Sequence, residues 1–153
     1  MKSIQHLAIT NKEGLLNMIR PMYPDTVREY LAELSADECD VNKNKRGAVR
    51  KHLGDIIPDD SMRRRLLSWL FYGSPLIEKS TSELTGGQVE ALHKWIGAEK
   101  MDDVWIPNSY TITEIKWCLK AMQAEMSKSD EYLPDIVKAA IELGGVITEV
   151  KHV

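Results

Sequence analysis

Apolar residues recur at helical spacing along most of this chain, and polar or glycine residues mark the ends of the periodic stretches. Repeats at i, i+3, i+4 and i+7 are typical of helices that bury one face. They predict helices at about 24–34, 43–53, 58–72, 86–96 and 111–126, with others after Thr10 and over 133–143. The pattern therefore predicts a mainly α fold, a single compact helical domain of about six helices over residues 1–153.

Recognisable residues mark the predicted helix boundaries. In a capping box, a Thr side chain and a Glu or Gln three residues later bind free backbone amides at a helix start. Such boxes begin at Thr10, Thr85 and Thr111. Gly54, Gly73 and Gly97 follow apolar positions and predict helix ends, because glycine readily adopts the left-handed conformation found there.

Strand signals are weak and lie mainly at the two ends of the chain. The β-branched segments 3–9 and 146–153 predict at most a short β ribbon formed by the termini, and we expect β structure to be confined there. Residues 101–108 are expected to form a loop or a short extended piece.

The helix that begins at Pro58 has apolar residues over more than half of its wheel, which is typical of a largely buried helix. We expect it to pair with the helix that follows Thr85. Trp69 and Leu70 should then be buried against Leu92 and Trp95.

Composition narrows the class of protein. The chain is 43% apolar, too apolar for a disordered protein, and no apolar run approaches the roughly 20 residues that cross a membrane. The first residues have no apolar segment of the signal-peptide type, so we expect a cytoplasmic protein without a membrane partner. Cys39 and Cys118 are expected to be reduced thiols. The four histidines are scattered without metal-ligand spacing, and no metal or cofactor is expected.

Charge is distributed unevenly along the chain. Residues 41–70 carry eight basic and three acidic side chains, a net charge of +5, between flanks of −3 and −5. The basic side chains that we expect to contact nucleic acid are Lys43, Arg46, Arg50, Lys51, Arg63, Arg64 and Arg65. The first four fall on one side of a helix, and the set forms a patch able to neutralise several phosphates. Tyr72 is the nearby aromatic suited to stacking. The alternative interpretation is a solvated surface that pairs with the acidic flanks.

A nuclease-like pattern is also present, since Asp135 is followed by Glu149 and Lys151 near the end of the chain. Acidic pairs of this kind bind a catalytic divalent metal in some nucleases. Here Asp135 falls at a predicted helix start and Lys151 lies two residues from the chain end, which favours plain surface charge.

Residues 63–96 resemble a small helical module of bacteriophage proteins that act in recombination, replication or regulation, including the Mu-like regulatory proteins. The resemblance rests on a helix, a glycine, a short spacer, the run Ser80-Thr81-Ser82-Glu83-Leu84-Thr85, and a second helix that ends in Trp95-Ile96. It covers about a quarter of the chain and implies no catalytic residue.

Two function hypotheses follow. The first is a non-enzymatic, phage-type DNA-associated accessory protein, a recombination or replication mediator or a regulator, that contacts the nucleic-acid backbone through its basic helices. The second is a protein-binding adaptor or inhibitor of a host enzyme that does not bind nucleic acid. The salt dependence of oligonucleotide binding separates the two.

Overall fold

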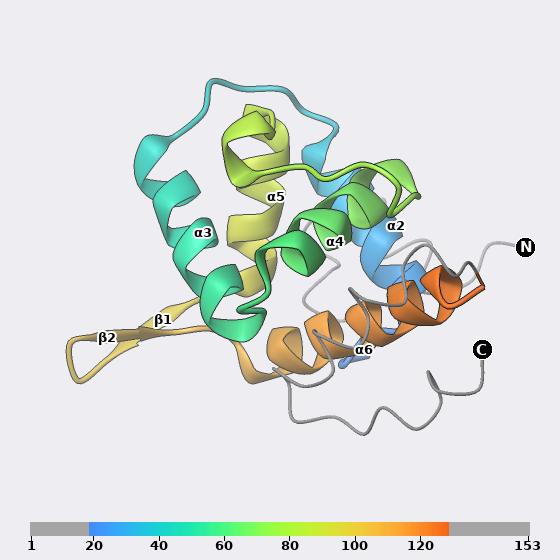
Figure 1. Cartoon of the computed structure of the whole chain (residues 1–153). Coiled ribbons are helices and arrows are strands. Elements are labelled where there is room, and N and C mark those ends of the chain that lie inside the picture. The colour runs from blue at the N-terminus through green and yellow to red at the C-terminus, as the bar shows by residue number, and fades with distance from the viewer. Residues whose placement is uncertain (1–18, 129–153) are drawn as a thin grey trace, which may run out of the picture.

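Five α helices and one β hairpin form the part of the chain that the computed structural model describes, residues 19–128 (Figure 1). In chain order the elements are α2 (Pro24–Ser35), α3 (Lys43–Ile56), α4 (Asp60–Tyr72), the 3₁₀ turn η2 (Thr81–Glu83), α5 (Gly86–Ile96), β1 (Glu99–Met101), β2 (Val104–Ile106) and α6 (Ser109–Met126). The predicted mainly α fold is confirmed. The helices expected after Thr10 and over 133–143, and both terminal strands, lie outside the described residues. No helix within 19–128 has the length and apolar character needed to cross a membrane.

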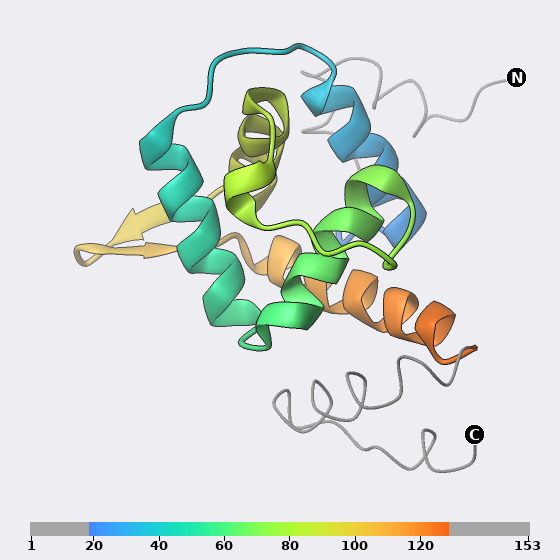
Figure 2. The ribbon, with the colours of Figure 1, turned by 45° about the horizontal axis from the view of Figure 1, so that its top comes forward.

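The helices pack around α5, which lies mainly against α2 and α3, while α4 packs against α2 and α6 (Figures 1 and 2). All five contribute to one core, in which Leu31, Leu53, Leu66, Leu92 and Ile115 are almost completely buried. The core is therefore continuous from one end of the described chain to the other.

The predicted pairing of α4 with α5 needs correction. Trp69 is buried as expected, but its ring lies 4.2 Å from the guanidinium of Arg28 on α2, and its Nε1 donates to Glu125 of α6 at 2.6 Å. The wide apolar face of α4 thus packs between two helices that periodicity did not identify as its partners. A hydrogen bond from Gln88 to the Tyr72 hydroxyl links the end of α4 to the start of α5.

Most predicted helix ends are confirmed. Gly73 and Gly97 end α4 and α5 in the left-handed conformation, and both hydrogen bonds of the Thr85 capping box form. Gly54 does not end α3, which continues to Ile56. Pro58 sets that end instead, because the residue before a proline avoids helical geometry, and Ile57 is extended.

The β hairpin lies between α5 and α6, so the expectation that β structure is confined to the termini is wrong. Its strands are antiparallel, with Lys100 opposite Trp105. Asp102 and Asp103 both have positive φ at the turn, as two-residue hairpins require, and aspartate tolerates this conformation better than most residues. Three-residue strands are too short to show a period of two in the sequence.

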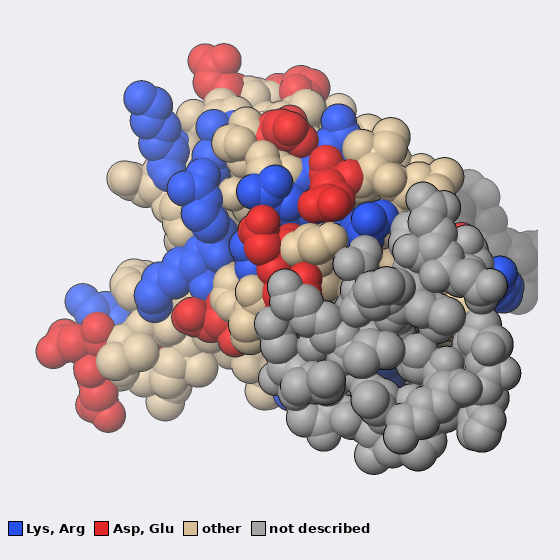
Figure 3. Space-filling view, viewed as in Figure 1, with Lys and Arg blue, Asp and Glu red and all other residues tan. Residues whose placement is uncertain are grey.

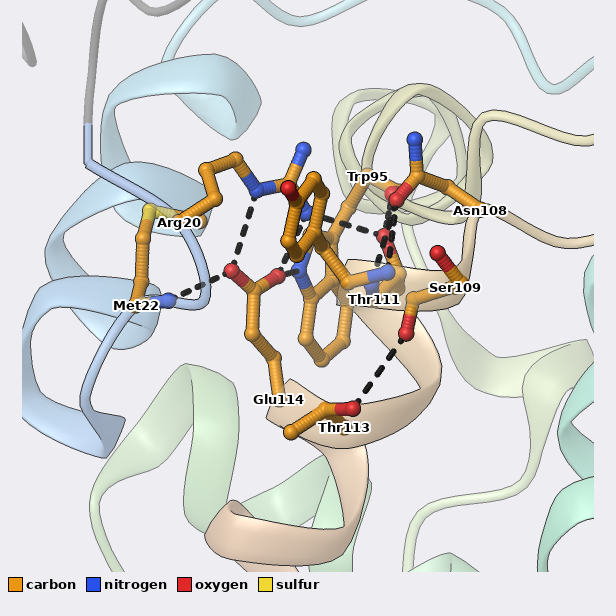
Figure 4. Close-up of polar contacts among 9 residues, drawn as sticks. Arg20, Met22, Trp95, Asn108, Ser109, Thr111, Thr113 and Glu114 are labelled. Carbon is orange, nitrogen blue, oxygen red and sulfur yellow. Dashed lines mark hydrogen bonds and ion pairs between the residues drawn. The ribbon is translucent and has the colours of Figure 1, made fainter.

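The capping box predicted at Thr111 is also wrong. The helix begins two residues earlier, with Asn108 as its cap, and Thr111 and Glu114 are fully buried inside it. The Thr111 hydroxyl donates to the carbonyl of Trp95, and the Glu114 carboxylate accepts hydrogen bonds from elsewhere in the fold (Figure 4). Two residues that match a helix-start motif therefore form a contact between helices.

Glu114 accepts four hydrogen bonds, which is the full capacity of a carboxylate. Its Oε1 accepts from Arg20 Nη2 at 2.6 Å and from Trp95 Nε1 at 2.8 Å. Its Oε2 accepts from Arg20 Nε at 3.0 Å and from the backbone amide of Met22 at 2.6 Å. This one side chain thus joins the segment before α2, the end of α5 and the start of α6.

The Glu114→Gln variant should lose about 3 kcal/mol of unfolding free energy, measured by chemical denaturation. An amide nitrogen cannot accept, so donors on one side of the carboxylate would lose their acceptor, and Arg20 would lose its counter-ion. Glu29→Gln, an exposed position on α2 with the same change in charge, is the matched control and should change little. Equal stability of the two variants would contradict the role given to Glu114.

The two cysteines should differ sharply in reactivity. Cys39 is exposed, whereas burial raises the pKa of the Cys118 thiol to about 12, and only a thiolate attacks disulfide reagents. At mildly alkaline pH, one thiol per folded chain should react with such a reagent, and both should react in denaturant. Two fast thiols in the folded protein would show that α6 is not packed as described.

Candidate nucleic-acid interface

The exposed side of α3 carries the strongest positive charge among the described elements. Lys43, Arg50 and Lys51 are exposed, and none forms an ion pair with a residue in 19–128. At 100° per residue they fall within an arc of about 100°, opposite the buried Val49 and His52. We call Lys43, Arg50 and Lys51 the α3 ridge. Figure 3 shows Lys and Arg side chains gathered over α3, with Asp and Glu side chains towards the middle of the view.

Two basic residues of α3 bind the loop that connects α4 to α5. Arg46 donates to the carbonyl of Leu84, and Arg50 donates from Nε to the Thr81 hydroxyl, both at 3.0 Å. Both acceptors are neutral, so neither hydrogen bond offsets the positive charge of the arginine. Arg46 is half-buried, and Arg50 is exposed and remains part of the ridge.

The arginine triplet of α4 is engaged within the chain. Arg63 and Arg64 pair with Asp60, and Arg63 also donates to the carbonyl of Ile57. Arg65 donates to the carbonyl of Pro75 at 2.8 Å and lies 3.7 Å from Glu78.

Of the seven basic residues predicted to form the patch, only Lys43, Arg50 and Lys51 are exposed. The other four arginines are half-buried, because they hold the start of α4 or the loop after α4.

Tyr72 is exposed, but its ring and hydroxyl are both in use. Lys79 lies over the ring at 5.6 Å, and the hydroxyl accepts from Gln88. An exposed aromatic beside the ridge is instead Trp105 of the hairpin, which lines a cavity together with Lys51. Sequence reasoning missed it because the two residues are 54 positions apart and the hairpin was not predicted.

Two glycines, Gly47 and Gly54, lie on the same side of α3 as the ridge. A Cβ added at either position would meet nothing within 4 Å, and neither has positive φ, so packing and backbone geometry do not require glycine there. A glycine inside a helix costs about 0.5–1 kcal/mol relative to alanine. Gly86 is different, since a Cβ there would lie 1.8 Å from the Cys39 carbonyl oxygen.

Catalytic features are sparse in the same region. No group of three metal-ligating side chains comes together within residues 19–128. Glu114 is saturated with donors and closed to solvent. Asp135, Glu149 and Lys151 lie outside the described residues.

Comparisons with protein-family models, with curated proteins and with solved structures found no match to this chain.

The Gly47→Ala variant should raise the unfolding free energy by about 0.5–1 kcal/mol, because alanine fits the open site and favours the helix. Gly86→Ala should lower it, since the added methyl group would push α5 away from the backbone of Cys39 and Asp40. Thermal melts of both variants check the contrast, and a destabilised Gly47→Ala would mean that this face of α3 is packed.

Proposed function

We propose that this chain is a non-enzymatic, nucleic-acid-associated accessory protein of the phage recombination, replication or regulatory kind. The α3 ridge contacts the phosphate backbone. Arg63, Arg64 and Arg65, which the sequence also suggested for this role, shape the scaffold instead.

The observation that carries the proposal is the exposed cationic strip without acidic partners. Arg63, Arg64 and Arg65 are each paired with Asp60 or Glu78. Lys43 and Lys51 have no such partner among the described residues, and Arg50 bonds only a neutral hydroxyl. Free cations release counter-ions from a phosphate chain when they bind it, and this release drives sequence-independent binding.

Gly47 and Gly54 of α3 support the proposal that this side of the helix contacts phosphates. They weaken the helix on the side that carries the ridge, at positions where neither packing nor backbone geometry requires glycine. Glycine allows a phosphate backbone to approach the helix closely.

A protein-binding adaptor is the second candidate, and one observation favours it. Met101, Val104 and Ile106 share one face of the hairpin and are all exposed. Exposed apolar side chains that adjoin one another are typical of protein contact sites. In this alternative the ridge serves only solubility, and no oligonucleotide binds at physiological salt.

The Lys43→Gln, Lys51→Gln double variant should bind a fluorescent single-stranded oligonucleotide more weakly than the parent, whatever its base sequence. Titrations by fluorescence anisotropy over about 50–200 mM salt should give a log–log slope that is shallower by about 1.4, since each lost contact removes about 0.7. The charge-matched control, Lys116→Gln with Lys120→Gln on α6, should keep the parent's slope.

Equal loss in the two double variants would mean that only net charge matters. Absence of binding by the parent at about 150 mM salt, where non-specific binders reach about 10⁻⁴–10⁻⁶ M, would favour the adaptor. Gly47→Ala with Gly54→Ala adds an independent check, because it should weaken binding while raising the melting temperature.

A further inference from the structure

A cavity of about 360 Å³ lies between α3, α5 and the hairpin, beside the ridge. Apolar side chains such as Val49 and Ile96 form much of its wall, and Trp105 closes one side. Ligand sites commonly measure about 300–1,000 Å³, with apolar walls and a few polar groups. This cavity is at the small end of that range, which suits one planar group.

Trp105 is available for stacking in a way that the other exposed aromatics are not. Tyr23 stacks on Trp117, Tyr72 carries Lys79, and Tyr110 lies 5.8 Å from the Arg20 guanidinium. Trp105 makes no ring or cation contact with a described residue, although it is 54% exposed. An indole face is thus left open at the edge of an apolar cavity.

His52 is a second polar group at the cavity. It is only 4% exposed and lines the cavity, and it makes no hydrogen bond to another residue in 19–128, yet its ring nitrogens are not among the fully buried side-chain atoms that lack a partner. The imidazole therefore reaches the open space of the cavity and can bond a group that enters it.

The histidines of this cavity suit a ligand with mixed donors and acceptors. Burial lowers the pKa of His52, and Lys51 lowers it further, outweighing Asp55. Burial likewise lowers the pKa of His93, helped by Lys45 and opposed by Glu90. A neutral imidazole offers one donor and one acceptor, which matches the edge of a nucleobase.

Charge at the rim favours a nucleotide over a neutral aromatic molecule. Lys45 is held by Glu90 at 2.9 Å, which leaves Lys51 as the wall cation without an acidic partner. Lys100 pairs with Trp105 across the hairpin and therefore lies on the same face. A base on Trp105 would place its phosphates near Lys51, at the end of the ridge.

We propose that this cavity binds one unstacked nucleobase of a single-stranded nucleic acid, stacked on Trp105 and hydrogen-bonded to His52. The site rests on the proposed function, because the ridge supplies the backbone contacts on either side. It adds a base-dependent component to binding that phosphate contacts alone do not give.

The test compares a short oligothymidylate with an abasic strand of the same length and charge. The parent should prefer the base-containing strand, and Trp105→Ala should weaken that strand's binding roughly 5- to 150-fold, the range that base–aromatic stacking covers. Binding of the abasic strand should not change. Trp105→Phe should retain most of the affinity but lose the tryptophan quenching that the parent shows with oligothymidylate.

Val104→Ala is the matched control, since Val104 is exposed on the opposite face of the same hairpin and should leave both affinities unchanged. If the parent binds both strands equally and Trp105→Ala has no effect, the base site is wrong while the backbone interface stands. If the parent binds neither strand, both proposals are wrong.

Discussion

The Glu114 carboxylate is the interaction on which the arrangement of this fold depends. A buried, ionised carboxylate is strongly destabilising unless its oxygens are paired, and the donors that pair it come from two separate parts of the chain outside α6. Arg20 and Met22 lie before α2, and Trp95 lies at the end of α5. An arrangement that moved any of these segments away from α6 would leave the buried carboxylate with fewer donors, so the carboxylate favours the arrangement observed.

The basic residues of the chain serve two different purposes. Arg46 and Arg65 bind carbonyl oxygens of the loop between α4 and α5, where few backbone groups are paired in regular structure. Arginine suits this task because its fork of donors reaches several acceptors and keeps its charge. Lysines 43 and 51 make no such contacts. Arg50 is exposed as well and bonds only a neutral hydroxyl of the loop, so these three cations form a narrow strip that stays open to a partner.

Sequence periodicity predicted the helices well, because their apolar faces repeat over three or more turns and their caps are local. It failed where the deciding contact is distant. Gly54 sits within a helix because Pro58 sets the end, and Thr111 matched a capping box while its hydroxyl served Trp95. The basic character of α3 could be recognised directly in the sequence. The pairing of Arg63 and Arg64 with Asp60 is local to α4, three and four residues apart. The contacts of Arg65 with the loop after α4 and the nearness of Trp105 to α3 depend on tertiary structure and could not be predicted.

The position of Trp105 is tied to the Glu114 network through the ends of the hairpin. Before the strands, Trp95 is held by Glu114 and Thr111; after them, the Asn108 amide donates to the Ile96 carbonyl at 2.8 Å. A two-stranded hairpin is marginal alone, so its direction depends on these anchors. The Glu114 carboxylate therefore influences the proposed base site although it does not line the cavity. It holds the residues at the base of the hairpin, and their position determines which face of the hairpin Trp105 presents to α3.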